Sequence, residues 1–129
     1  MDVNFTKVKN YLLDLEYTIE KEDEKTGMFT ISKEDEGIVN MIIVCADPIV
    51  ILEQPLFKLK SESLSTYKQL LQKNRDIIHG AFALNENDEV IFRDTLQLEN
   101  LDLNEIEGSI NSLTILLSEY SDKIVEFSK

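Results

Sequence analysis

The sequence contains no tryptophan, one cysteine, one histidine and four scattered glycines. A lone Cys45 excludes an intramolecular disulfide and a multi-cysteine metal site, and its apolar surroundings indicate a small buried hydrophobe. The glycines are too far apart for a P-loop or a dinucleotide-binding fingerprint. A nucleophile needs an oriented base, and nothing in the sequence brings His79, the only histidine, to Cys45. The sequence therefore predicts neither catalytic residues nor a cofactor.

Long apolar runs and an excess of positive charge are also missing. No apolar stretch approaches the ~20 residues that cross a membrane, and residues 1–4 lack the basic and apolar regions of a signal peptide. We therefore expect a cytoplasmic protein. The 25 Asp and Glu residues outnumber the 13 Lys and Arg residues, which gives a formal charge of −12. Such a field repels phosphate backbones and anionic membranes, so we expect neither nucleic-acid nor membrane partners.

Three acidic turns are the candidates for an oxygen-ligand metal site: residues 20–24, 34–36 and 85–89. None has the alternating ligands, central glycine and final glutamate of an EF-hand loop. Charge runs in turns are usually solvated, and we interpret these turns in that way, with no metal site. A metal-dependent small-molecule binder or enzyme that uses the acidic turns is the alternative hypothesis.

The last third of the chain has the clearest pattern. Residues 81–84 and 89–98 flank a polar turn and predict a hairpin, and a long amphipathic helix follows from Leu103. Asp102 and Glu105 form a capping-box pattern at its start. Gly108 and Ser112 are small residues four apart on this helix. They indicate either close packing against the sheet or a subunit contact, and we name them as candidates for a dimer contact.

The first part of the chain predicts a helix over 4–16, capped by Asp2 or Asn4. Its next strands are predicted over 28–32, 38–46 and 49–59, with a possible short edge strand over 17–22. The strand over 38–46 is apolar on both faces, which is typical of a central strand covered on both sides. Pro55 cannot donate to a ladder and belongs at a bulge or on a free edge.

A second helix is predicted over 63–79, capped by Ser61 or Ser63, with Gly80 in a left-handed conformation after it. In the hairpin that follows, Asp94 falls on the apolar face, where it marks either a strand end or a partner such as Arg93 or Lys58. The whole chain, 1–129, is therefore a single α+β domain with the order α-β-β-β-α-β-β-α and three or four strands before the second helix.

This order resembles a known family, with the segments 70–74, 79–82 and 90–96 and the long terminal helix as the matching features. It is similar to the stand-alone YbjN-type proteins and, more distantly, to the Tir-chaperone family of type III secretion chaperones. The resemblance implies a small acidic bacterial protein with a strongly bent antiparallel sheet flanked by helices. It also implies that the secretion-chaperone branch forms homodimers and holds an extended client segment. No active-site residue is implied.

The resulting hypothesis is a non-enzymatic, chaperone-like or regulatory protein-binding module that forms a homodimer. An extended and basic client segment is expected to lie along exposed strand edges, near Pro55 or along residues 17–22. Val50, Leu52 and Leu56 are expected to point outward and form the client surface.

Overall fold

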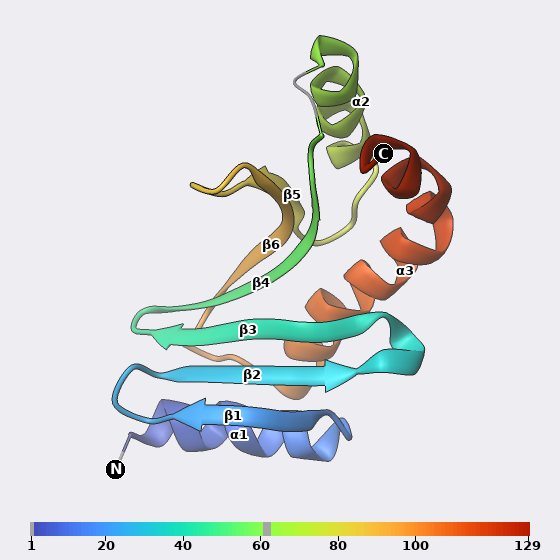
Figure 1. Cartoon of the computed structure of the whole chain (residues 1–129). Helices are drawn as coiled ribbons and strands as arrows, with labels where there is room; N and C mark the ends of the chain where they lie inside the picture. The colour runs from blue at the N-terminus through green and yellow to red at the C-terminus, as the bar shows by residue number, and fades with distance from the viewer. Residues whose placement is uncertain (1, 61–62) are drawn as a thin grey trace.

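The computed structural model describes residues 2–60 and 63–129, which form one antiparallel sheet and three α-helices (Figure 1). Six strands lie in the order β1-β2-β3-β4-β6-β5. The α+β class is confirmed, and four strands precede the second helix, so the short edge strand that the sequence left open is present. The elements are α1 (Val3–Asp14), β1 (Thr18–Asp23), β2 (Met28–Lys33), the short 3₁₀ helix η1 (Glu34–Glu36), β3 (Ile38–Ala46), β4 (Ile49–Lys58), α2 (Leu64–Asn74), β5 (Ala81–Leu84), β6 (Glu89–Gln97) and α3 (Leu103–Phe127).

The sheet is bent, and β4 carries the bend. Figure 1 shows β4 curving away from the flat β1–β3 region toward α2. The register of β4 and β6 shifts between Pro55 and Phe57, so Pro55 lies at a bulge, as its missing N–H requires. β4 pairs with β3 along one edge and with β6 along the other, and it therefore joins the two halves of the sheet.

Helices α1 and α3 pack on the same face of the sheet. The register aligns Phe29 of β2, Ile43 of β3, Leu52 of β4 and Asp94 of β6 on that face. Phe5 of α1 stacks on Phe29 with ring centroids 4.3 Å apart. Ser109 of α3 donates to Asp94 Oδ2 at 2.7 Å. The partner of Asp94 is therefore a helix hydroxyl, and neither Arg93 nor Lys58 is needed to explain its position.

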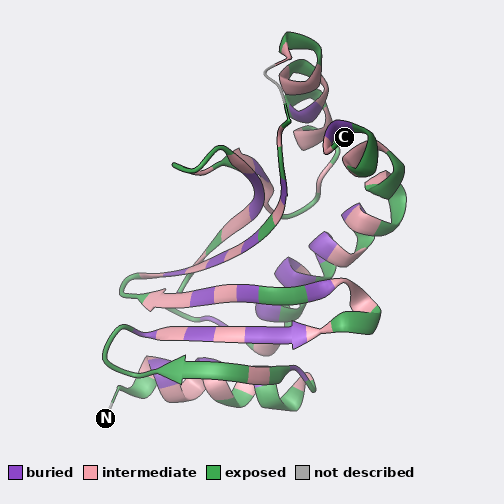
Figure 2. Ribbon diagram, viewed as in Figure 1, coloured by how far each residue is buried: buried purple, intermediate pink, exposed green. Residues whose placement is uncertain are grey.

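The opposite face of the sheet carries apolar side chains as well. Within residues 2–60 and 63–129, neither α1 nor α3 crosses it (Figure 1). The register aligns Met28, Val44 and Ile51 across β2, β3 and β4, and Ile42 and Ile49 lie on the same side. All five are half-buried (Figure 2). The prediction that β3 is covered on both sides is therefore wrong for a single chain. We call these five residues the open-face patch.

The helix starts follow the sequence closely. Asp2 accepts from the amides of Asn4 and Phe5 at the start of α1. Asp102 accepts from the amide of Glu105 at the start of α3, where Leu101 and Ile106 are both buried.

Helix α2 begins as predicted and ends early. Ser63 is its N-cap and accepts from the amide of Thr66; the other candidate, Ser61, lies outside the described residues. The helix ends at Asn74 and not at His79. The Asn74 side chain accepts from the Phe82 amide at 2.7 Å and donates to the Phe82 carbonyl at 3.2 Å. These two bonds tie the end of α2 to β5, and the intervening residues form a turn that ends at Gly80, with φ +83°.

Candidate protein-binding surfaces

The structure corrects two of the three client-surface residues that the sequence predicts. Val50 and Leu52 are 0% exposed and lie in the core. Even-numbered residues from 50 to 54 face the helices, and Ile49 and Ile51 face the open side. An error of one residue in a strand inverts every side chain, and the apolar run 49–52 gives no alternation from which to choose. Leu56 is half-buried, packs against the core and lines a cavity of about 520 Å³.

The open-face patch is bordered by an acidic edge strand. β1 has a paired neighbour on one side only. Its register places Lys21 beside Thr30 and Asp23 beside Met28, so the charged strand continues the patch toward the edge of the sheet. Glu22 forms an ion pair with Lys9 of α1 at 3.0 Å. The exposed Glu20 and Asp23 leave this rim negative.

The patch also reaches the cavity that contains Leu56. Ile42 lines this cavity together with Pro55, Leu56 and two α3 side chains, Leu117 and Ile124. The region near Pro55, which the sequence singles out, is therefore continuous with the apolar side chains of the open face. Its accessible residues are Leu56 and Ile42, since Val50 and Leu52 are enclosed.

A second apolar surface lies between α2 and β5. A cavity of about 450 Å³ is lined by Tyr67, Leu70, Leu71 and Asn74 of α2 and by Phe82, Ala83, Leu84 and Val90 of the hairpin. We call it the α2–β5 groove. Leu71, on its α2 wall, is 70% exposed, and Leu64, the first residue of α2, is 83% exposed. Exposed large apolar side chains gathered in one place indicate an interaction surface.

Sequence reasoning missed the exposure of α2. The helix has the broad apolar face that usually indicates burial, but only Leu70 is buried. A signal was present in the charge pattern: residues 63–75 contain Lys68, Lys73 and Arg75 and no acid, in a chain of net charge −12. A basic, apolar helix in an acidic chain is suited to contact a negative surface.

Gly108 and Ser112 serve packing within the chain. Ser112 is 6% exposed; its hydroxyl donates to the His79 carbonyl at 2.7 Å and accepts from the His79 amide at 3.2 Å. A Cβ added at Gly108 would lie 3.7 Å from the His79 ring. The sequence left open close packing or a subunit contact. The structure favours close packing, against the turn before β5, and Ser112 is unsuited to contact another subunit.

The only cysteine and the only histidine of the sequence lie on different segments of the fold. Burial first, and the carboxylate of Asp2 second, raise the pKa of the Cys45 thiol to about 11, which disfavours the thiolate nucleophile at neutral pH. His79 is exposed in the connection between α2 and β5, whereas Cys45 lies in β3. Within the described ranges, no group of three or more His, Cys, Asp and Glu side chains is placed to hold a metal ion.

Among the described residues, no helix is both long enough and apolar enough to cross a bilayer.

Comparison with known proteins gives a consistent family and fold. The family model CesT_Tir_1 matches residues 1–129. YbjN from E. coli is 12% identical with a TM-score of 0.70, over 92% of this chain and 91% of that one. A chain of the HopA1–SchA chaperone–effector complex is 12% identical with a TM-score of 0.68, over 95% and 98%. The Yersinia pestis type III secretion chaperone SycH, solved with a fragment of YscM2, is 15% identical with a TM-score of 0.58, over 98% and 100%. No curated protein matches the sequence.

Proposed function

The chain belongs to the CesT_Tir_1 family, and from this premise we propose that it is a cytoplasmic, non-enzymatic chaperone-like protein. It holds an extended segment of a client protein on its sheet and acts as a homodimer. Family membership and the likeness to chains of chaperone complexes support a protein-binding chaperone role. The observation that carries the proposal is the open-face patch, because its five apolar side chains lie on the sheet face opposite the one on which α1 and α3 pack. One of the five, Ile42, also lines a cavity with Leu117 and Ile124 of α3.

An antiparallel sheet can leave one face in water when that face is polar. Here the open face offers Met28, Ile42, Val44, Ile49 and Ile51, and burying them against a partner is favourable by roughly 25 cal/mol per Å² of apolar surface. The edge of β1 adds unpaired main-chain groups that an extended segment can join. Its acidic side chains attract a basic segment and accelerate its arrival. A client that alternates apolar and basic residues fits both features.

The client surface is tested with two synthetic peptides of about ten residues, since strands of that length are typical in sheets. One alternates Val with Lys, and the other alternates Val with Glu. Fluorescence anisotropy of labelled peptide should show binding of the Val-Lys peptide and none of the Val-Glu peptide. Val44→Asp should weaken binding about tenfold or more, because a buried carboxylate next to the client costs more than 1.4 kcal/mol.

Val125→Asp is the matched control, since Val125 is exposed on α3 and the charge change is identical. Each variant adds a negative charge, so unspecific attraction of a basic peptide would increase in both. Equal affinities for the Val44→Asp and Val125→Asp proteins would remove the open face as the client site. Val44→Thr preserves the side-chain shape and keeps the test valid if Val44→Asp fails to fold.

The homodimer is assigned to the α2–β5 groove. A two-fold interface must be self-complementary. Each chain carries two exposed leucines on α2, Leu64 and Leu71, and an apolar groove that Leu71 lines. The charges also complement one another. α2 is basic, and the hairpin that forms the other wall of the groove carries three acids, Glu86 and Asp88 in its turn and Glu89 at the start of β6. A second copy turned by two-fold symmetry can bring the basic helix of each chain to the acidic turn of the other.

Light scattering after size-exclusion chromatography tests the dimer. We expect a mass twice the chain mass of 14.9 kDa, independent of concentration in the micromolar range. Leu71→Glu should convert the protein to monomers, because it places a charge in the apolar interface. Leu13→Glu is the matched control at an exposed leucine of α1 and should stay dimeric. A monomeric parent protein would remove the dimer and leave the client surface unaffected.

A further inference from the structure

A polar cavity lies on the side of the molecule where α1, η1 and α3 meet. Its volume is about 320 Å³, within the range of small-ligand pockets. Three segments supply its polar side chains: Tyr17 from the connection between α1 and β1, Lys33 and Glu36 from the end of β2 and from η1, and Asn104, Glu107 and Asn111 from the first turns of α3. The open-face patch and the α2–β5 groove share no lining residue with it.

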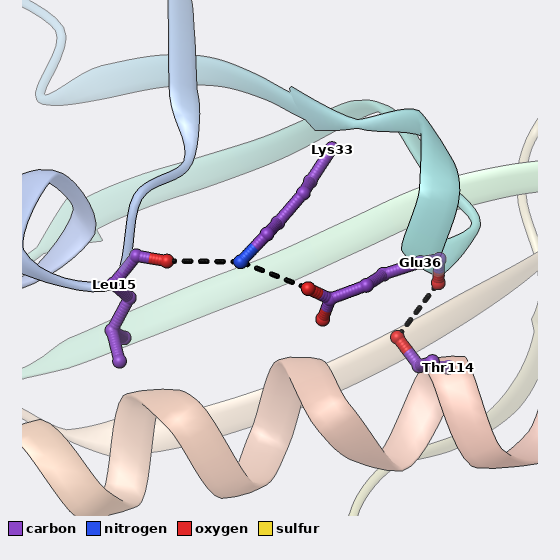
Figure 3. A network of polar contacts seen from close by, with 4 residues as sticks. All are labelled: Leu15, Lys33, Glu36 and Thr114. Atoms are coloured by element: carbon purple, nitrogen blue, oxygen red, sulfur yellow. Dashed lines mark hydrogen bonds and ion pairs between the residues drawn. The ribbon is translucent and has the colours of Figure 1, made fainter.

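Polar contacts hold the walls of this cavity in place (Figure 3). Lys33 Nζ donates to the Leu15 carbonyl at 3.2 Å and lies 2.8 Å from Glu36 Oε2. Thr114 of α3 donates to the Glu36 carbonyl at 2.8 Å. The Lys33 charge is therefore neutralised by Glu36, and the three segments are tied together. A preformed cavity loses little conformational entropy when it binds a ligand.

The side chain of Tyr17 lines the cavity. The residue is 6% exposed, and Lys33 Nζ lies 5.0 Å from its ring centroid. In the described part of the chain, Tyr17 Oη makes no hydrogen bond. Every fully enclosed side-chain nitrogen or oxygen there has a partner, so Tyr17 Oη is not fully enclosed. The hydroxyl therefore opens onto the cavity that Tyr17 lines. Burial, followed by the charges of Glu36 and Glu107, raises the pKa of Tyr17 to about 12, so the phenol stays protonated.

Glu107 supplies the uncompensated charge of the cavity. It forms no ion pair with any described residue. Asn104 precedes it by three residues and Asn111 follows it by four, so all three side chains share one face of α3. The cavity thus offers a carboxylate, amide oxygens and a phenol oxygen as acceptors, and the Lys33–Glu36 pair adds no net charge.

From this arrangement we infer that the cavity between Tyr17, Glu36 and Glu107 is a binding site for a guanidinium group, either on an arginine side chain of a bound protein or on a free guanidino compound. A guanidinium is planar, carries five N–H donors and is more weakly hydrated than an ammonium, so it can bond several separated oxygens at once. An anion would be repelled by the Glu107 carboxylate and by the net charge of −12. If the guanidinium belongs to a client, the inference rests on the proposed function.

The test is a titration of the 129-residue protein with two ligands, monitored by ¹H–¹⁵N NMR. The first is L-arginine, and the second is the Val-Lys peptide with one central Lys replaced by Arg. Citrulline, the neutral isostere, is the control for both. We expect arginine to shift the backbone signal of Gly108, which lines the cavity, and the side-chain amide signals of Asn104 and Asn111, and citrulline to shift none of them.

Two variants locate the binding energy. Glu107→Gln should weaken arginine binding about tenfold, the value of a charge-assisted hydrogen bond in a partly exposed site. Tyr17→Phe should weaken it about threefold without lowering the melting temperature, since the lost hydroxyl has no partner in the described chain. Asp122→Asn is the matched control, because it removes an equal charge from an exposed position of α3.

The outcomes are decisive in both directions. An Arg-containing peptide that shifts the Gly108, Asn104 and Asn111 signals at a concentration at least tenfold lower than L-arginine, where the Val-Lys peptide shifts none of them, identifies a protein side chain as the source. Shifts of these signals by L-arginine at the same or a lower concentration identify a small molecule. Shifts scattered over the acidic surface, equal responses to citrulline, or equal losses in Glu107→Gln and Asp122→Asn would overturn the inference. The Val-Lys peptide can still bind in that case, so failure of this site and failure of the proposed function are separate results.

Discussion

At the scale of single residues, Cys45 illustrates how position determines chemistry. It lies opposite Val50 on the helix-covered face of β3 and is half-buried. Burial and the nearby Asp2 carboxylate raise the pKa of its thiol from the ordinary value of 9.0 to about 11. The folded state therefore favours the protonated thiol more strongly than the unfolded state does.

This difference predicts a dependence of stability on pH. Because the folded-state pKa is the higher one, the contribution of Cys45 to the free energy of unfolding is complete below about pH 9 and is lost as the pH rises to about 11. Urea unfolding under reducing conditions at about pH 8 and about pH 10.5 should show a larger loss for the parent protein than for Cys45→Ala. Tyrosine ionisation affects both proteins equally. Parallel losses would mean that the thiol is solvated.

The sequence predicted residue roles well where a local pattern was complete. Asp2, Ser63 and Asp102 cap their helices because a short acceptor side chain before an apolar period is a local signal. Prediction from the sequence failed at Val50 and Leu52, because four apolar residues in a row carry no information about which side of the strand faces the core. Asp94 stayed ambiguous because its partner, Ser109, lies on another element.

At the scale of elements, the same substitution, glycine to alanine, should have opposite effects at two glycines with different roles. Gly80 ends the turn after α2 with φ +83°, and a Cβ there would lie 2.5 Å from the Phe92 ring and 3.0 Å from the Arg93 carbonyl oxygen. Gly108 lies inside α3, and its nearest neighbour for a Cβ is the His79 ring at 3.7 Å. The first site has no room for a side chain, and the second has ordinary contact distance.

Gly80→Ala should therefore destabilise the protein by about 2–4 kcal/mol, from backbone strain and steric overlap together. Gly108→Ala should stabilise it by up to about 1 kcal/mol through helix propensity. Urea unfolding of the two variants at one pH measures both effects. A loss of stability in Gly108→Ala, or a change of its oligomeric mass, would show that the small residue makes a contact beyond this chain.

Element boundaries that depend on distant partners could not be read from the sequence. The apolar period of α2 continues through Ile77 and Ile78, so helical periodicity extended the prediction to His79. The helix ends at Asn74 because that side chain bonds both backbone groups of Phe82. Such a bond is visible only when β5 lies beside the end of the helix.

At the scale of the whole molecule, the net charge of −12 opposes compaction. Raising the NaCl concentration from about 0.01 M to more than about 0.1 M shortens the Debye length from about 30 Å to less than about 10 Å. The shorter length reduces this repulsion. We expect the melting temperature to rise by roughly 3–5 °C, which corresponds to about 1 kcal/mol.

The same experiment tests the metal hypothesis drawn from the acidic turns. CaCl₂ or MgCl₂ at matched ionic strength should give the same melting temperature as NaCl. An additional rise that grows with the logarithm of metal concentration would indicate specific binding and would favour the metal-dependent alternative.

The architecture of the whole molecule was predictable to the level of class and family resemblance, because element order and apolar periods persist over the entire chain. The placement of β6 between β4 and β5 was not predictable from them, since pairing of distant strands leaves no local pattern. The apolar character of both faces of β3 was seen correctly, and its interpretation as double coverage was wrong. One face packs under α1 and α3, and we propose that the other binds a client.

The position of β4 has a consequence for how the chain is made. Its Glu53 pairs with Arg93 of β6, 40 residues later, whereas its other edge pairs with β3 directly before it. As the chain leaves the ribosome, the hairpins from β1 to β4 can form in turn from local contacts. The second edge of the apolar strand β4 stays unpaired until β6 has been synthesised. A stalled or truncated chain that stops before β6 keeps that edge, and unpaired apolar edges promote aggregation. The nascent chain is thus most vulnerable in the interval between these two strands.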